Sequence, residues 1–313
     1  MRLAADTKNR ARFAAVGIGL GVGSWTLRHC RSAAVQAWTP SHLDVVRAGP
    51  LHVRTGGSTG PVVVLLHGLV ANGDIFGAPF DSLAESSTLV VPDLLGFGRS
   101  LDEQRSSFTA DEHLDALDAM LEDLGLTHRS LIIGAHSMGV ALAVRWAARH
   151  GARCEAVVGF GAPVYPDAAA VHDTIADTGL MARAFVANTR WAQAACRLNC
   201  RHRRIAGLFA AAAAPELPTC IARAASLHTW PAYRDAIDDV ISATDWPKVL
   251  TELAADGTSV ELVWGSEDRI GDRSFAATLP GASVAGIDNA DHHLPLTHPT
   301  RCVERLASHL LTF

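Results

Sequence analysis

The chain has 313 residues, of which 49% are hydrophobic, and its formal net charge at pH 7 is only −5. This length suffices for one large α/β domain with an inserted segment, whose core needs no disulfides. The apolar content argues against a disordered chain, and the small negative charge argues against nucleic-acid binding. We therefore expect a globular protein with a small-molecule ligand and no nucleic acid partner.

The first 41 residues contain an apolar, glycine-rich run, Phe13 to Leu27, with basic residues on both sides. As a helix this run is about 22 Å long, less than the ~30 Å hydrocarbon core of a bilayer, so a full span is disfavoured. Three interpretations stay open: a secretory signal with a cleavage site at Val35 to Ala37, a membrane-surface anchor, and a helix packed on the body of the protein. Location accordingly stays open between the cytoplasm, a membrane surface reached through residues 13–27, and export.

From residue 43 the pattern changes to short strands. Apolar runs between turn residues predict strands at 43–47, 51–54, 61–67 and 88–91, and the third of these is apolar throughout, as in a fully buried strand. Residues 110–124 have apolar side chains at helical spacing and acidic residues on the other face, which predicts an amphipathic helix.

The stretch from Leu131 to Val140 places a serine at the corner between a buried strand and a helix. A turn this sharp lifts the hydroxyl of Ser137 away from the sheet, and it tolerates only small residues two before and two after the serine. Those residues are Ala135 and Gly139. Because the following helix begins here, its N-terminus favours developing negative charge at the same place. The sequence therefore predicts Ser137 as a nucleophile.

The second half of the chain returns to strands after a long helical stretch. A strand is predicted at 156–160, no strand is evident across 163–244, and strands resume at 259–264 and 283–287. The middle stretch is rich in alanine and is divided by prolines: Pro215, Pro218 and Pro231. A last amphipathic helix is expected at about 300–311. This order predicts an α/β fold with a mostly parallel central sheet of about eight strands, flanked by helices and carrying an inserted helical cap.

The expected organisation has four segments. Residues 1–41 form the N-terminal apolar and basic segment, 42–164 the first part of the core, 165–245 the cap and 246–313 the second part of the core. In such a sheet the functional site lies at the carboxyl ends of the strands.

Candidate partners for Ser137 follow the last two strands. A serine hydroxyl reacts only when a base takes its proton, and the base needs an acid that fixes its tautomer and stabilises its charge. Asp268 and His292 supply these groups, in the chain order Ser, Asp, His.

With Ser137, Asp268 and His292 in this order, the chain resembles the α/β-hydrolase superfamily, in particular its serine-dependent esterase and lipase-like branch with a lid. The matching motifs are Leu-Leu-His-Gly at 65–68, Pro-Asp-Leu-Leu-Gly-Phe-Gly-Arg-Ser at 92–100, the turn at 135–139, Trp-Gly-Ser-Glu-Asp at 264–268 and Asp-His-His-Leu-Pro-Leu-Thr-His-Pro at 291–299. The resemblance covers residues from about 43 to 313, apart from the cap.

The resemblance also implies an oxyanion hole, formed by the backbone N–H groups of Leu69 and Met138. Two residues depart from the family pattern: Ala135 and Asp291 stand where the family usually has glycine. A carboxylate beside His292 either raises the pKa of that histidine or faces solvent.

Other residues compete for these roles. His67 is expected to be a buried structural histidine, His136 to pack under the turn, and Asp93 to organise the glycine loop at 96–98. The alternatives are His293 and His298 for the base, and Glu267 and Asp167 for the acid.

The resulting hypothesis is a serine hydrolase that cleaves a carboxylic ester through an acyl-enzyme, with no cofactor and with an apolar acyl or alcohol part in its substrate. Cleavage of a carbon-carbon bond, thioester or amide by the same three residues is the alternative, and a non-catalytic binding protein is a third. The resemblance argues against epoxide or halide chemistry, because relatives with those activities use an aspartate in place of the serine.

The remaining expectations concern the cap and the cysteines. The large apolar side chains of the cap either line an acyl pocket or pack the cap on itself: Trp191, Trp230, Phe185 and Phe209. Cys196, Cys200 and His202 fit no common zinc spacing, so no metal site is expected. The six cysteines are scattered without a paired framework, as is typical of reduced thiols: Cys30, Cys154, Cys196, Cys200, Cys220 and Cys302.

Overall fold

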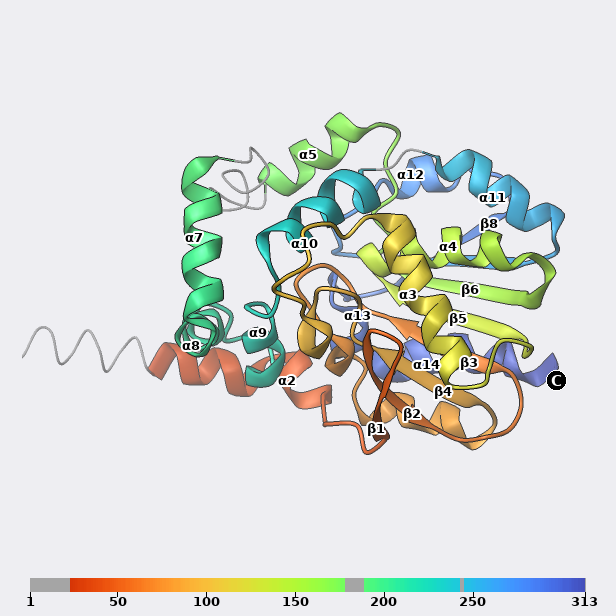
Figure 1. The fold of residues 1–313 in the computed structure, drawn as a ribbon, viewed down its shortest axis with the longest axis horizontal. Coiled ribbons are helices and arrows are strands. Elements are labelled where there is room, and N and C mark those ends of the chain that lie inside the picture. The colour runs from red at the N-terminus through yellow and green to blue at the C-terminus, as the bar shows by residue number, and fades with distance from the viewer. Residues whose placement is uncertain (1–22, 178–188, 243–244, 313) are drawn as a thin grey trace, which may run out of the picture.

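The computed structural model describes residues 23–177, 189–242 and 245–312. Figure 1 shows a central sheet with helices on both faces and a group of helices gathered at one end. The sheet has eight strands in the order β1-β2-β4-β3-β5-β6-β7-β8. The predicted fold class, a mostly parallel sheet with an inserted helical cap, is confirmed.

The eight strands lie where the sequence predicts them, with ends that differ by at most two residues. The pairs β1·β2 and β2·β4 are antiparallel, and the other pairs are parallel. The bounds are β1 Asp44–Ala48, β2 Leu51–Gly56, β3 Val62–Leu66, β4 Thr88–Pro92, β5 Leu131–His136, β6 Cys154–Phe160, β7 Ser259–Gly265 and β8 Ala282–Ile287.

The two faces of the sheet belong to two separate apolar cores. Alternate residues of β3 show this, because Val62 and Val64 pack in one core and Val63 and Leu65 in the other. The first core contains α3 (Ala110–Asp123), α4 (Met138–His150) and α11 (Trp246–Ala255). The second contains α14 (Pro299–Ser308) and a 3₁₀ segment, Ala78–Glu85, that the sequence analysis left unassigned. Continuous apolar runs are required in β3 and β5 because both faces are covered.

Between β6 and α11 the described chain consists of helices joined by short loops, and forms the cap. Pro215 and Pro218 lie between α8 and α9, and Pro231 occupies the first turn of α10, where its missing N–H costs nothing. The helices are α5 (Ala168–Asp177), α7 (Arg190–Arg201), α8 (Arg203–Ala213), α9 (Thr219–Ala224) and α10 (Trp230–Asp235), followed by a π-helical turn at Ala236–Ile241. After β7 come the short helices α12 (Arg273–Ala276) and α13 (Leu294–Thr297).

The N-terminal segment packs on the cap from residue 23 onward. Residues 23–31 are helical, followed by α2 (Ala33–Ala37), which includes the candidate cleavage site. His29 Nδ1 lies 3.0 Å from the carbonyl oxygen of Pro215, and Ser32 donates to the carbonyl of Glu216; in Figure 1 this orange-red helix lies beside α8 and α9. Residues 13–22 of the apolar run lie outside the described residues. Over the ranges described, no helix is long and apolar enough to cross a bilayer.

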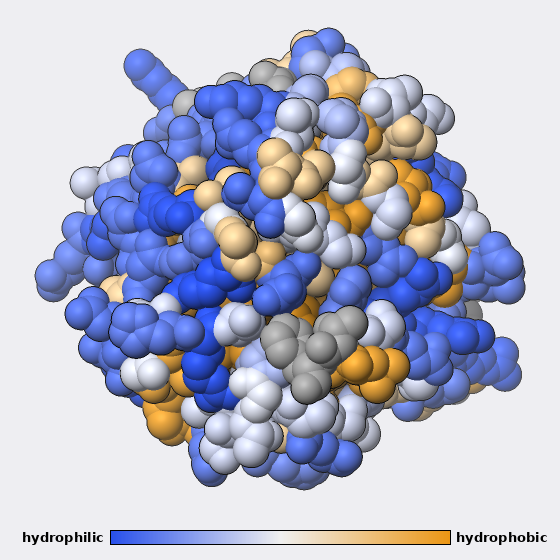
Figure 2. Space-filling view, turned by 90° about the vertical axis from the view of Figure 1, so that its right-hand side faces the viewer, coloured by the Kyte–Doolittle hydropathy of each residue, from blue (hydrophilic) through white to orange (hydrophobic). Residues whose placement is uncertain are grey.

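Figure 2 shows the face of the molecule on the side away from α7 and α8. Hydrophilic residues predominate there, with apolar residues in small separate groups. No broad apolar surface is visible on that face.

Candidate active site

Ser137 sits at a strained corner between β5 and α4. Its backbone has φ 52° and ψ −122°, and its N–H donates to the carbonyl of Phe160 at 2.9 Å. Gly139 is required two residues later, because a Cβ there would lie 2.5 Å from the carbonyl oxygen of Leu66. A non-glycine residue at positive φ is costly, and such strain often occurs at functional sites. The corner exposes the Ser137 hydroxyl to a cavity.

A continuous series of hydrogen bonds connects the hydroxyl to a buried carboxylate. Ser137 Oγ lies 3.0 Å from His292 Nε2, and His292 Nδ1 lies 3.1 and 3.0 Å from the two oxygens of Asp268. The Asp268 side chain has no solvent exposure and also accepts from the N–H of Ile270 at 2.8 Å, whereas the His292 side chain is 21% exposed. The three side chains follow β5, β7 and β8, whose carboxyl ends lie at the same edge of the parallel part of the sheet. This arrangement lets a histidine accept the serine proton while the aspartate holds its tautomer.

Gly161, the residue after β6, makes room for this series, and the sequence analysis missed it. Its φ is +61°, and a Cβ would lie 2.8 Å from His292 Nδ1 and 3.0 Å from Asp268 Oδ2. One feature of the sequence could have indicated it: Gly161 directly follows the buried strand β6, which pairs with β5, the strand that leads to Ser137.

The two predicted oxyanion donors lie on the segments that border Ser137. Met138 is the first residue of α4, so its N–H has no acceptor within the helix. Leu69 lies on the loop after β3 and lines the cavity together with Ser137. The loop passes close to the corner, since a Cβ on Gly68 would be only 3.0 Å from that of Ser137.

His67 and His136 are buried and bound to backbone groups. His67 Nε2 accepts from the N–H of Leu94 at 2.8 Å and its Nδ1 lies 2.8 Å from the carbonyl oxygen of Gly68, so this neutral ring ties the loops after β3 and β4 together. His136 Nε2 lies 2.9 Å from the carbonyl oxygen of His292. Burial lowers the pKa of both rings, and in His136 the charge of nearby His292 adds to the effect.

The alternative acids and bases lie outside the hydrogen-bonded series of Ser137, His292 and Asp268. His293 is paired with Asp291 at 3.6 Å, and this hydrogen-bonding partner lowers the pKa of Asp291. The Asp291 carboxylate is therefore engaged by His293, while His292 is paired with Asp268. The remaining alternatives are placed as follows: His298 Nδ1 lies 2.9 Å from Thr297 Oγ1, Asp167 accepts from the N–H of Ala170, and Glu267 is exposed.

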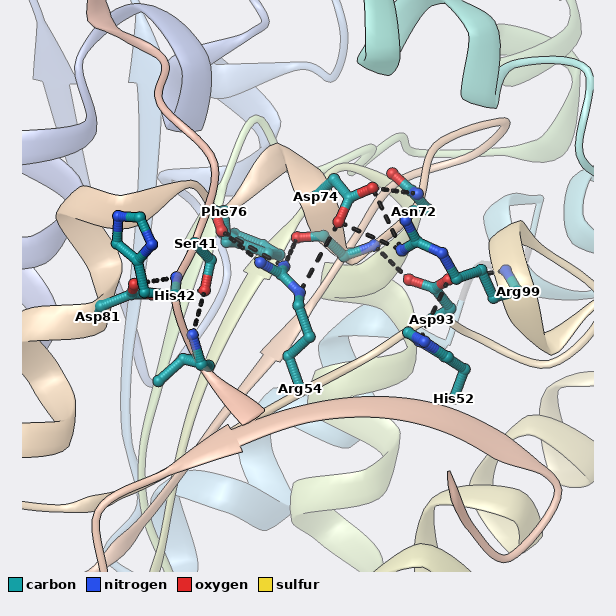
Figure 3. Close-up of polar contacts among 12 residues, drawn as sticks. Ser41, His42, His52, Arg54, Asn72, Asp74, Phe76, Asp81, Asp93 and Arg99 are labelled. Carbon is teal, nitrogen blue, oxygen red and sulfur yellow. Dashed lines mark hydrogen bonds and ion pairs between the residues drawn. The ribbon is translucent and has the colours of Figure 1, made fainter. Parts of the chain in front are cut away.

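A buried polar network supports the loop that carries Leu69 (Figure 3). Arg54 reaches from β2 to the carbonyls of Gly73 and Phe76. Asp93 accepts from the N–H groups of Gly73 and Arg99 at 2.8 and 2.7 Å, so it joins this loop to the glycine loop at 96–98. The sequence analysis expected Asp93 to organise the glycine loop, without naming a contact, and it missed Arg54, which is only 6% exposed.

The cavity in front of Ser137 has a volume of about 210 Å³ and lies between the loop after β3 and the cap. Its wall on the cap side is made of small and aliphatic residues of α8, α9, the link between them and the residue after α9: Ala210, Ala214, Leu217, Ile221, Ala222 and Ala225. Of the large cap residues in question, Trp191 and Phe209 are 56% and 72% exposed, and Trp230 stacks on Tyr233. None of these three lines the cavity, and Phe185 lies outside the described residues.

Cys196 and Cys200 lie near His228, which is not the histidine closest to them in sequence, His202. Cys196 Sγ is 4.0 Å from Cys200 Sγ and 3.9 Å from His228 Nε2. Within the described ranges, no group of three or more histidine, cysteine or acidic side chains is arranged to hold a metal ion.

A model of the alpha/beta hydrolase family matches residues 63–305, from β3 into α14. The chain belongs to the alpha/beta hydrolase family. The hydrolase is 36% identical over 92 residues to Lipase 3 of Moraxella sp. (strain TA144), a match that covers 29% of each chain. It is 25% identical over 283 residues to the cis-3-alkyl-4-alkyloxetan-2-one decarboxylase of Xanthomonas campestris pv. campestris, which covers 82% of this chain and 91% of that protein. Its fold is similar to that of a thermophilic esterase from Thermogutta terrifontis, with a TM-score of 0.61, 19% identity, and coverage of 86% of this chain and 98% of the esterase.

Proposed function

We propose that this hydrolase cleaves a carboxylic ester through an acyl-enzyme intermediate. The observation that supports the proposal is the hydrogen-bonded series from Ser137 through His292 to Asp268 at the mouth of a cavity. Ser137 Oγ attacks the ester carbonyl carbon while His292 Nε2 takes its proton, and Asp268 stabilises the imidazolium that results. The N–H groups of Leu69 and Met138 bind the oxygen that becomes negative.

The second half of the reaction uses the same groups. His292 returns its proton to the departing alcohol, leaving the acyl group bound to Ser137. A water molecule then gives its proton to His292 and attacks the acyl carbon, which releases the acid and restores the serine hydroxyl. No cofactor takes part in these steps.

The substrate in this proposal has an apolar acyl or alcohol part. The wall of alanines, Leu217 and Ile221 offers such a group contacts without hydrogen-bonding partners. Residues 165–245 act as the cap that shapes this wall, on the core formed by 42–164 and 246–313. Each methylene buried against the wall contributes about 0.8 kcal/mol, or about a fourfold gain in kcat/KM.

Residues 1–41 are proposed to contact a membrane surface through the apolar run at 13–27. Its basic flanks suit an anionic lipid surface, and Arg28 and Arg31 belong to the helix that leads from the run to the cap. Binding to anionic vesicles should be lost on removal of residues 1–22. Equal binding by the full and shortened chains would contradict this part of the proposal.

The test of the reaction is hydrolysis of p-nitrophenyl esters of increasing acyl length by the wild type and by Ser137→Ala. We expect the wild type to turn over part of the series and the variant to lose about 10⁴-fold or more in kcat. A fluorophosphonate probe should label the wild type at Ser137 and leave the folded variant unlabelled. Turnover by both proteins would exclude Ser137 as the nucleophile, and activity of the wild type only on amides, thioesters or carbon-carbon bonds would replace the ester proposal.

A further inference from the structure

A second cavity, of about 340 Å³, lies against the same two cap helices as the first, and the reaction does not use it. Its wall contains four arginines and one carboxylate: Arg99, Arg203, Arg204, Arg223 and Asp74. Such an excess of one charge inside a concave surface raises the local concentration of ions of the opposite sign.

Two of the arginines are held by acidic partners. Arg99 lies 3.4 Å from Asp74, which also lies 3.8 Å from Arg54, so one carboxylate serves two guanidinium groups (Figure 3). Arg203 pairs with Glu103 at 2.8 Å and donates to the carbonyls of residues 226 and 228, at 3.0 and 2.8 Å. These contacts fix the Arg203 side chain in the wall of the cavity.

The other two arginines have no counter-ion among the residues described. Arg204 lies on α8 one turn before Gly207, so both residues lie on one face of the helix. The face of α8 that carries Gly207 packs beside α9, since a Cβ on Gly207 would be in ordinary contact with the Cβ of Arg223, at 3.5 Å. Both arginines line the cavity and neither forms an ion pair with a described acidic residue. Their charges are therefore available to a ligand.

We propose that this arginine cavity binds a phosphate group. Guanidinium forks match the oxygens of a phosphate, and a pair of them gives stronger and more oriented binding than single ammonium groups. The phosphate belongs either to free inorganic phosphate or to the alcohol part of an ester substrate, and both sources use the same contacts.

The arginine cavity shares wall segments with the cavity in front of Ser137. Adjacent residues at the end of α9 and just after it line different cavities: Ala222 and Ala225 line the first, and Arg223 and Ala224 the second. The loop after β3 is shared as well, because Ala71 lines the first cavity and Asn72 the second. A phosphate held by Arg204 and Arg223 would draw α8 and α9 together and fix the wall of the acyl cavity.

Calorimetric titration with inorganic phosphate at low ionic strength tests the binding itself. We expect saturable binding to the wild type, at least a tenfold weaker affinity in the double variant Arg204→Gln/Arg223→Gln, and unchanged affinity in the control Arg301→Gln, whose arginine is exposed and paired with Glu304 on α14. Ser137→Ala should bind phosphate as the wild type does, so this test is independent of the proposed reaction. No saturable binding to the wild type, or equal binding by the folded double variant, would overturn the proposal.

Kinetics with two esters of one acyl group distinguish the sources of the phosphate. The alcohol part is glycerol phosphate in one ester and glycerol in the other. If the phosphate is part of the substrate, kcat/KM is higher for the phosphorylated ester, and the double variant loses that preference without a change in the neutral ester. If the phosphate is free, the wild type shows no preference, and added inorganic phosphate changes the KM of both esters in the wild type but not in the double variant.

Discussion

Replacement of Gly161 by alanine should separate the geometry of the site from the stability of the fold. The added Cβ would lie 2.8 Å from His292 Nδ1 and 3.0 Å from Asp268 Oδ2, closer than side-chain carbons pack in proteins. Asp268 is buried and held by the N–H of Ile270, whereas the His292 ring is partly exposed. The clash is therefore relieved by a movement of His292 away from its position beside Ser137.

Two magnitudes follow. Alanine at a φ of +61° costs about 1–2 kcal/mol of conformational energy, which lowers the free energy of unfolding. A misplacement of a catalytic group by up to 1 Å lowers kcat by as much as about 10²-fold, so Gly161→Ala should lose about 10- to 100-fold in kcat.

The matched control is Gly125→Ala. Gly125 has a φ of +69° and no atom within 4 Å of the place where a Cβ would stand, so the control suffers the same backbone strain without a clash. Urea unfolding should show a similar loss of stability in both variants, and p-nitrophenyl ester hydrolysis should be impaired in Gly161→Ala alone. Wild-type kcat in Gly161→Ala, or an equal loss in the control, would refute the assignment of Gly161 to the spacing of His292 and Asp268.

Two further predictions concern buried polar residues outside the hydrogen-bonded series. Burial lowers the pKa of His113 to about 3, so between about pH 6.5 and pH 3 the unfolded chain binds more protons than the folded one and the wild type loses stability as pH falls. The variant His113→Leu does not take part in this titration, so from pH 7 to pH 5 its free energy of unfolding in urea should rise by about 2 kcal/mol relative to that of the wild type. If the free energies of unfolding of the two proteins change with pH in parallel, His113 is not a neutral buried residue. Arg54→Met removes the donors to two backbone carbonyls and should lower the free energy of unfolding by about 1–3 kcal/mol, while Arg99→Met, which removes a more exposed partner of the same Asp74, should cost under about 1 kcal/mol. If both arginine variants lose the same free energy of unfolding, Arg54 does not stabilise the loop after β3.

The sheet was predictable because parallel strands covered on both faces must be apolar throughout. Runs such as 62–66 and 131–133 leave no other interpretation in a chain that alternates with amphipathic helices. The grouping of Ser137, Asp268 and His292 was predictable for a topological reason, since parallel strands end at one edge of the sheet. Their catalytic roles stay predictions until the esterase test is made.

The cap could be predicted only as helical. Its sequence is rich in alanine, so no periodic pattern of large side chains tells which face of α8 or α9 is inward, and two of its bulky residues, Trp191 and Phe209, are exposed. The burial of Arg54 could not be predicted from local pattern either. It depends on a loop about twenty residues further along the chain, which folds over β2. The contact of residues 28–32 with residues 215 and 216 is a meeting of distant segments, which no local pattern encodes.

The position of the cap between β6 and β7 has an entropic consequence for how such hydrolases change. Pairing of Ala156 with Ser259 closes a loop of about 100 residues, which costs about 4 kcal/mol of chain entropy. Because that cost grows only with the logarithm of loop length, doubling the length of this loop by enlarging the cap would add about 0.6 kcal/mol. The sheet and the loops that carry Ser137, Asp268 and His292 can therefore stay constant while insertions and deletions remodel the wall of the acyl cavity and the arginine cavity together.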